Sequence, residues 1–176
     1  ETFSDHPSSA WYGAWYVSEV LDILTQNPEV WKKTIFILTY DENDGYFDHV
    51  APFVAPNPRD PKTGRVSDKI DARVEYVSME QEKKKTGVPE EYMRESSIGL
   101  GYRVPLVIAS PWSRGGWVNS QVFDHSSGLQ FLEKFLSHKM GKPVREPNIS
   151  DWRRATCGDL SSNFRPYNGE KISTLE

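Results

Sequence analysis

An apolar run followed closely by two acids constrains this chain more than any other feature. Residues 34–38 read Thr-Ile-Phe-Ile-Leu, and Asp41 and Glu42 stand three residues further on. A run so rich in β-branched and aromatic residues predicts a strand over residues 34–40 that is buried on both faces. Ionised carboxylates would lose their hydration there, so the two acids are expected just past its carboxyl end. Open α/β sheets collect ligands at that edge.

Two segments have the apolar periodicity of helices. The first covers residues 10–28 and ends near Pro28, because the residue before a proline disfavours the α conformation. The second carries a capping-box pattern at Ser127 and Gln130, and Gly141 suits its C-terminal cap. The expected buried stripe of the first helix comprises Val17, Val20, Leu21 and Leu24. That of the second comprises Leu129, Leu132, Phe135 and Leu136.

A second buried strand is expected at residues 102–109, where Pro105 indicates a strand margin or a bulge. Residues 51–65 carry four prolines and predict a long irregular loop. Residues 66–101 are polar and charged, which suggests an insertion or lid beside the site. Residues 143–176 lack clear periodicity and are expected to wrap the surface. The order helix, strand, excursion, strand, helix predicts an α/β domain with a mainly parallel sheet flanked by helices.

Composition narrows the class of protein further. A length of 176 residues supports one domain or a large piece of one, and a net charge of −4 gives no indication of a nucleic-acid groove. No apolar run approaches the roughly 20 residues that cross a bilayer. The single cysteine, Cys157, cannot form an internal disulfide and is expected to be structural. No signal peptide is visible and no initiator Met is present, which suggests a fragment of a longer protein.

The pair Asp41 and Glu42 is suited to a divalent cation. Adjacent carboxylates repel each other, and a cation removes that repulsion. Oxygen ligands suit Mg²⁺, Ca²⁺ or Mn²⁺, while an added imidazole would admit Zn²⁺ or iron. The alternative is an acidic turn capped by backbone amides, because Asn43-Asp44-Gly45 has strong turn chemistry.

Three histidines could join such a site, and each has an ordinary alternative. His6 precedes a proline and could be a simple loop residue. His49 follows the Gly45 turn and could approach Asp41, although turn chemistry alone also explains it. His125 follows Asp124 at the expected start of a helix, where capping is favoured over catalysis.

Aromatic residues cluster near the candidate site in sequence. Exposed aromatic rings could hold a quaternary ammonium group by cation–π attraction. The alternative, which is favoured for most of them, is a place in the hydrophobic core. The residues concerned are Trp11, Tyr12, Trp15, Tyr16, Tyr46 and Phe47.

Four ordered stretches resemble a known family, the bacterial phosphoesterases that comprise phospholipases C and related acid phosphatases. The last stretch is most similar to the phosphocholine-specific phospholipase C branch. The resemblance covers most of residues 1–165 and implies an alkaline-phosphatase-like α/β fold with metal-dependent hydrolysis of phosphoesters. The stretches are SDHPSSA, TIFILTYDENDGYFDHVAPF, GLGYRVPLVIASPWSRGGWVNSQVFDHSSGLQFLEKF and NISDWRRATCGDLSSNF.

The resemblance also implies roles for individual residues. Asp41 and Glu42 match the paired acidic metal ligands of the family. His6 matches an active-site histidine that contacts the phosphoryl group or protonates the leaving group. Asp48 and His49 match a family motif, so His49 joins the candidate catalytic residues. The cofactor is expected to be a divalent metal ion, which the sequence does not identify.

The family places its Ser or Thr nucleophile and a further Glu-Asn metal-ligand pair upstream of the SDHP stretch. The chain is therefore expected to be the C-terminal part of a catalytic domain over residues 1–165, with 166–176 as a tail or linker. Alone it is expected to be inactive and to bind metal weakly, because part of the ligand set is missing. The upstream half of the same protein is thus an expected partner.

The function implied is that of a periplasmic or secreted phospholipase C that releases phosphocholine from phosphatidylcholine or sphingomyelin. A phospholipid or phosphocholine ester would be the substrate, with transient contact to a membrane surface and no nucleic-acid partner. Two alternatives stay open: an acid phosphatase of the same family, and a non-catalytic binding module of a larger protein.

Overall fold

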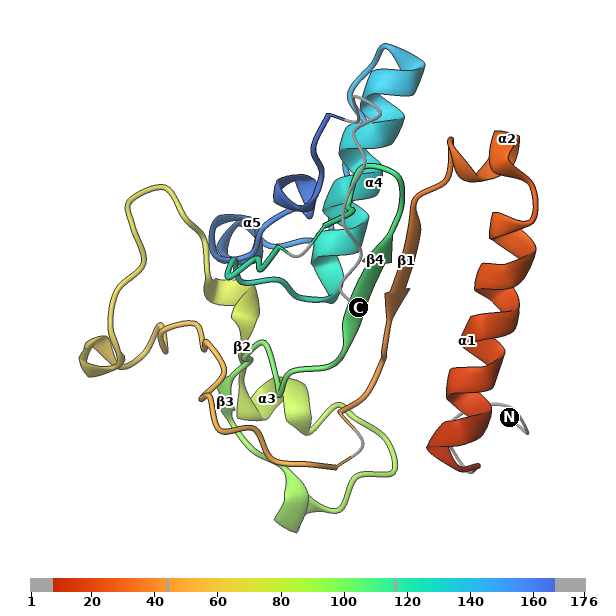
Figure 1. The fold of residues 1–176 in the computed structure, drawn as a ribbon. Helices are drawn as coiled ribbons and strands as arrows, with labels where there is room; N and C mark the ends of the chain where they lie inside the picture. The colour runs from red at the N-terminus through yellow and green to blue at the C-terminus, as the bar shows by residue number, and fades with distance from the viewer. Residues whose placement is uncertain (1–7, 44, 116, 167–176) are drawn as a thin grey trace. The chain divides into compact units, whose positions relative to one another are not determined.

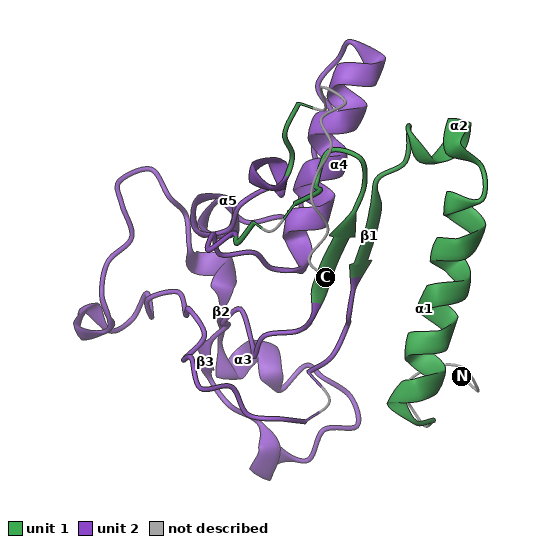
Figure 2. Ribbon diagram, in the orientation of Figure 1, with its two compact units in different colours: residues 1–38, 106–118, 164–176 green, residues 39–105, 119–163 purple. Residues whose placement is uncertain are grey.

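The computed structural model describes residues 8–43, 45–115 and 117–166 (Figure 1). The chain divides into two compact units, coloured separately in Figure 2. The smaller unit comprises residues 1–38, 106–118 and 164–176, and the larger comprises residues 39–105 and 119–163. The boundary between the units falls within the strand over Phe36–Thr39, and the candidate carboxylates Asp41 and Glu42 belong to the larger unit.

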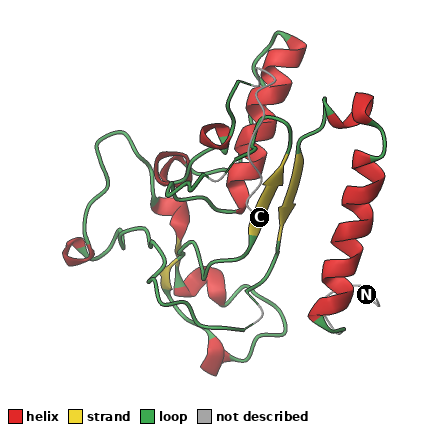
Figure 3. Cartoon of the chain, in the orientation of Figure 1, coloured by secondary structure: helices red, strands yellow, loops and turns green. Residues whose placement is uncertain are grey.

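Short helices and short strands alternate with long loops, most of all between β1 and β4 (Figure 3). The described residues therefore form an α/β chain rich in irregular structure. In chain order the elements are α1 (Ala10–Thr25), α2 (Pro28–Trp31), β1 (Phe36–Thr39), η1 (Pro61–Thr63), η2 (Arg73–Glu75), β2 (Tyr76–Val77), α3 (Met79–Glu82), η3 (Glu90–Tyr92), β3 (Ser96–Ser97), β4 (Leu106–Ala109), α4 (His125–Met140), α5 (Asp151–Thr156) and η4 (Ser161–Asn163).

Helix α1 confirms the first predicted helix. The side chain of Asn27 then accepts a hydrogen bond from the Glu29 N–H at 3.0 Å, and Pro28 opens the short helix α2. The four residues of the predicted stripe are half-buried, and Gly13 on the same face is buried. The aromatic residues of α1 do not lie in a core, contrary to expectation. Trp11, Tyr12, Trp15 and Tyr16 are all exposed.

Strands β1 and β4 form a two-stranded sheet. The Tyr40 N–H donates to the Pro105 carbonyl at 3.1 Å, so the end of β1 meets the beginning of β4, as in antiparallel pairing. Strand β4 starts directly after Pro105, which confirms the strand margin predicted there. The other sheet, β2 with β3, is also antiparallel. The sequence predicted a mainly parallel sheet, and no parallel pair occurs among the described residues.

Helix α4 confirms the second predicted helix, but its cap and its buried face differ from expectation. The N-cap is Asp124 rather than Ser127, whose hydroxyl instead accepts the Asp124 N–H at 3.0 Å. Gly141 ends the helix with a φ of +64°, as predicted. Ser127 and Gln130 are the buried residues of this helix. Three residues of the predicted apolar stripe, Leu129, Leu132 and Phe135, are exposed, contrary to that prediction.

The segment after residue 143 is more ordered than the sequence suggested. It contains α5, where the Ser150 hydroxyl accepts the Arg153 N–H at 3.1 Å. Trp152 of α5 packs with Ala55 and Ala72 in the core of the larger unit. Ile149, Cys157 and Leu160 are also buried. The prediction that this segment only wraps the surface is therefore wrong for its described part.

In the part of the chain that the structure covers, no helix combines the length and apolar character that crossing a membrane requires.

Candidate active site

Asp41 and Glu42 directly follow Tyr40 at the end of β1, as the sequence predicted. Both side chains are exposed. Neither makes a hydrogen bond or an ion pair with any residue that the structure describes. We call these two residues the acidic pair.

A turn separates the acidic pair from the next acid. The Tyr46 N–H donates to the Asn43 carbonyl at 3.3 Å, and Gly45 has a φ of +76°. Such a positive φ is easy for glycine and costly for most other residues. The predicted turn is therefore present. Tyr46 and Phe47, which follow it, are both exposed.

Asp48 is fixed by Arg103. The guanidinium donates from Nε to Oδ2 at 2.6 Å and from Nη2 to Oδ1 at 2.7 Å. The backbone N–H groups of Val50 and Arg103 donate to the same carboxylate. These bonds, the Arg103 side chain first, hold the pKa of Asp48 well below its usual range, although burial opposes the shift. With only 7% of its side chain exposed, Asp48 joins two loops and is not free for a ligand.

His49 lies beside this pair, with 84% of its side chain exposed to solvent. Its ring lies 3.3 Å from Arg103 Nη2 and 3.4 Å from Asp48 Oδ1. The contacts that the structure gives it are thus with these two residues. Its catalytic role stays a prediction.

His125 bonds to the backbone directly before the acidic pair. As the first residue of α4, it places Nε2 at 2.9 Å from the carbonyl oxygen of Tyr40. A carbonyl can only accept, so Nε2 carries the hydrogen. The sequence predicted a capping role for the Asp124–His125 pair, and Asp124 does cap α4, whereas His125 bonds to the end of β1.

A buried ionic cluster stabilises the start of α4. Arg153 of α5 donates from Nη1 to Asp124 at 2.6 Å and from Nε to Glu75 at 2.9 Å. The side chains of Asp124 and Glu75 are 3% and 5% exposed. Burial lowers the pKa of Arg153, but its hydrogen bonds to Glu75 and Asp124 outweigh that effect and raise it. We call Glu75, Arg153 and Asp124 the ionic hub.

Cys157 follows α5 and is buried. Burial, with the negative charge of Asp124 and a hydrogen bond to it, raises the pKa of the thiol to about 12. A thiol that stays protonated at neutral pH is a poor nucleophile. This agrees with the structural role that the sequence predicted.

The donor set fits a divalent cation in part. Two neighbouring carboxylates, which have no partner among the described residues, supply the oxygen ligands that hard cations prefer. Within the described ranges, however, no group of three or more His, Cys, Asp and Glu side chains is placed to hold an ion. His6 lies outside the described residues. The acidic pair is therefore an incomplete ligand set within this part of the chain.

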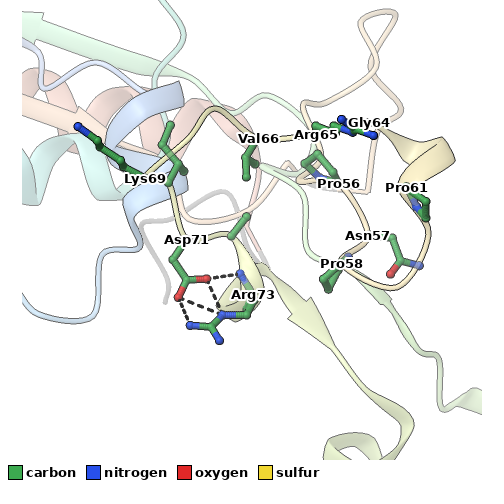
Figure 4. A pocket seen from close by; sticks show the side chains of 12 residues that line it. Pro56, Asn57, Pro58, Pro61, Gly64, Arg65, Val66, Lys69, Asp71 and Arg73 are labelled. Atoms are coloured by element: carbon green, nitrogen blue, oxygen red, sulfur yellow. Dashed lines mark hydrogen bonds and ion pairs between the residues drawn. The ribbon is translucent and has the colours of Figure 1, made fainter.

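A hollow of about 660 Å³ lies in the proline-rich loop of the larger unit (Figure 4). Its lining includes Pro56, Val66 and Ile70 but none of the candidate catalytic residues. Arg73 and Asp71 at its edge bond to each other, and the Arg73 side chain lowers the pKa of Asp71 to about 2. The hollow therefore adds nothing to the candidate site.

Sequence reasoning missed two positively charged residues that organise the surroundings of the site, Arg103 and Arg153. Each pairs with a carboxylate at least 29 residues away in the chain. The only sequence signal was their position within the stretches that resemble the phosphoesterases. Spacing could not have found them, because the pairing depends on how distant loops meet.

Comparison with known proteins places the chain in a family. A model of the phosphoesterase family matches residues 2–137. The non-hemolytic phospholipases C of Pseudomonas aeruginosa and Burkholderia pseudomallei are 49% and 48% identical over 98% and 93% of this chain. A hemolytic phospholipase C of Pseudomonas aeruginosa is 45% identical over 87% of it. The chain belongs to the phosphoesterase family, as the sequence motifs predicted.

The matched regions form a minor part of these relatives. The chain spans 23%, 21% and 18% of the lengths of the three proteins. The relatives are named phospholipase C, which is the name of a phosphoric ester hydrolase.

Proposed function

We propose that this chain is part of a phospholipase C-type phosphoester hydrolase, one that depends on a divalent metal ion. The observation that carries the proposal is the 49% identity to a phospholipase C over 98% of the chain. The open acidic pair at the end of β1 supports it, because such carboxylates suit a hard cation. The substrate proposed is phosphatidylcholine or sphingomyelin, from which phosphocholine would be released.

In this proposal the residues of the chain have separate tasks. Asp41 and Glu42 would hold the ion through their carboxylate oxygens. When bound, a divalent ion supplies positive charge that stabilises the charge developing on the phosphoryl oxygens. His6 would contact the phosphate or protonate the leaving group, and His49 would stand at the rim of the site. The nucleophile and the remaining ligands would come from the upstream half of the protein.

The exposed aromatic rings support a choline headgroup. Tyr46 and Phe47 follow the acidic pair in the chain and present their rings to solvent. Phe47 packs edge to face against Tyr102, with ring centroids 5.9 Å apart, which restrains its orientation. Aromatic faces attract quaternary ammonium groups. The same proposal includes transient contact with a membrane surface and a secreted or periplasmic location. It also includes an alkaline-phosphatase-like sheet, to which the antiparallel pair β1–β4 would belong.

The test uses the full-length protein with two chromogenic esters, p-nitrophenylphosphorylcholine and p-nitrophenyl phosphate. The proposal expects faster hydrolysis of the choline diester, loss of activity with a chelator, and its return with one divalent ion. Faster hydrolysis of the monoester would favour the acid phosphatase. Failure to hydrolyse either ester, together with no uptake of divalent ions, would favour the binding module.

A further inference from the structure

The hydrogen bond between His125 and Tyr40 joins residues that are 85 positions apart in the chain. The Tyr40 carbonyl belongs to the same planar peptide group as the Asp41 N–H. Because that group is rigid, fixing the direction of the C=O also fixes the position from which Asp41 continues. His125 therefore acts on the backbone of the acidic pair without touching its side chains.

Tyr40 is held from two directions. Its N–H donates to the Pro105 carbonyl at 3.1 Å, and its carbonyl accepts from His125 at 2.9 Å. The two residues that follow have no side-chain partner among those described. Among the contacts of the described residues, those of the Tyr40 backbone lie nearest to them along the chain, and the bond to His125 is the last one recorded before them.

The other end of this bond is well anchored. His125 directly follows the N-cap Asp124, whose side chain is bonded to Arg153 at 2.6 Å and to the Ser126 hydroxyl at 2.6 Å. The Ser127 hydroxyl accepts the Asp124 N–H. The start of α4 is thus tied to α5 and to Glu75 by a buried cluster, and His125 transmits that fixed position to the end of β1.

We propose that His125 is a positioning residue for the acidic pair, holding the Tyr40–Asp41 peptide so that both carboxylates can bind one divalent cation. This inference rests on the proposed function, since it concerns the same cation. The bond lies at an exposed position, so its removal should change the melting temperature little. Residues that orient metal ligands nevertheless change affinity by about 10- to 100-fold.

Two amides provide a matched pair of variants. In glutamine the side-chain nitrogen is as many bonds from Cα as Nε2 is in histidine, so His125→Gln can still donate to the Tyr40 carbonyl. Asparagine is one bond shorter and cannot reach it. If the ring is needed only for packing, both variants should be impaired. If the hydrogen bond positions the acidic pair, His125→Gln should behave as the wild type does and His125→Asn should not.

The experiment titrates the full-length protein with Mn²⁺, Ca²⁺ and Mg²⁺ in turn by calorimetry, and follows amide hydrogen exchange in residues 38–43 without metal. We expect His125→Asn and His125→Ala to weaken binding of the preferred ion by about 10- to 100-fold and to speed the exchange of the Asp41 amide. His125→Gln should resemble the wild type in both measurements. Asp41→Asn is the reference variant that removes a ligand.

The outcomes separate this inference from the proposed function. If Asp41→Asn abolishes ion binding while His125→Asn and His125→Ala bind as the wild type does, the positioning role is wrong and the metal site stands. If His125→Gln is as impaired as His125→Asn, the ring has only a structural role and the inference fails. If wild type and Asp41→Asn bind ions equally, the metal role of the acidic pair and this inference both fail. Should His125→Ala not fold, the comparison of Gln with Asn still decides.

Discussion

The larger unit holds two sets of carboxylates that differ in what neutralises them. In the ionic hub, Glu75 and Asp124 are buried and share the guanidinium of Arg153. In the acidic pair, Asp41 and Glu42 are exposed and have no partner among the described residues. Buried charges must be paired to be tolerated, whereas exposed ones stay hydrated until a ligand replaces the water.

This difference indicates which acids maintain the fold and which are free to act. An acid already neutralised by arginine has little left to offer a cation. Two acids at a strand end that have no partner among the described residues can gain a great deal from one. Substitutions in the ionic hub should therefore mainly lower the stability of the fold, whereas substitutions in the acidic pair should mainly lower activity.

The largest effect is expected for Asp41→Asn in the full-length protein. If the proposed metal role holds, removal of one charged ligand should lower kcat/KM on a phosphocholine ester by about a thousandfold, because a bound cation would supply several kcal/mol of transition-state stabilisation. The melting temperature should change little, since the side chain is exposed. Steady-state kinetics and calorimetry measure both quantities. Asp22→Asn, an exposed acid of α1, is the matched control, and equal activity in the two variants would remove the metal role.

Arg153→Met should act mainly on stability. It leaves Glu75 and Asp124 buried without their partner, which costs about 3–5 kcal/mol in the free energy of unfolding. Denaturant unfolding of the full-length protein measures this loss. Arg145→Met removes an arginine whose pairing with Asp151 is exposed, and should cost less than about 1 kcal/mol. A similar loss in both variants would contradict the expectation that the buried ion pairs of the hub contribute more to stability than an exposed pair does.

Asp48, a third acid that is neutralised by an arginine, should make the stability of the fold depend on pH. Its folded-state pKa lies well below the ordinary value of 3.8, so its stabilisation is fully present above that value and is lost as the pH falls through the folded-state pKa. Asp48→Asn should thus reduce by about one the number of protons taken up on acid unfolding. Unfolding curves at a series of pH values below about 4 measure this number. An unchanged proton uptake would mean that Arg103 does not hold Asp48 in solution.

The smallest effect is expected for an exposed ion pair. Lys84 lies 2.9 Å from Glu80, and both side chains are largely exposed. Lys84→Gln should change the free energy of unfolding by no more than about 0.5 kcal/mol, because water and salt screen the attraction. Chemical denaturation of this variant and of Arg153→Met compares the loss in the free energy of unfolding for an exposed and a buried ion pair. A loss comparable to that of Arg153→Met would show that burial does not separate the two kinds of pair.

Local sequence rules predicted much of the secondary structure. The apolar run before Asp41 forms β1, proline precedes β4, and glycine ends α4, because each depends on a few neighbouring residues. The same rules failed for α5, which is only six residues long and too short to show a period. They also predicted a buried leucine stripe on α4, whereas Ser127 and Gln130 are the buried residues of that helix.

The sequence by itself determined the family, the acidic pair and its place just past a strand. These follow from motif order and from the cost of burying unpaired carboxylates. Only the tertiary structure decided which acids are neutralised by Arg103 and Arg153, and that His125 reaches the peptide before Asp41. Such contacts join residues 29 to 85 positions apart, and the order of residues along a chain does not state which distant loops will meet.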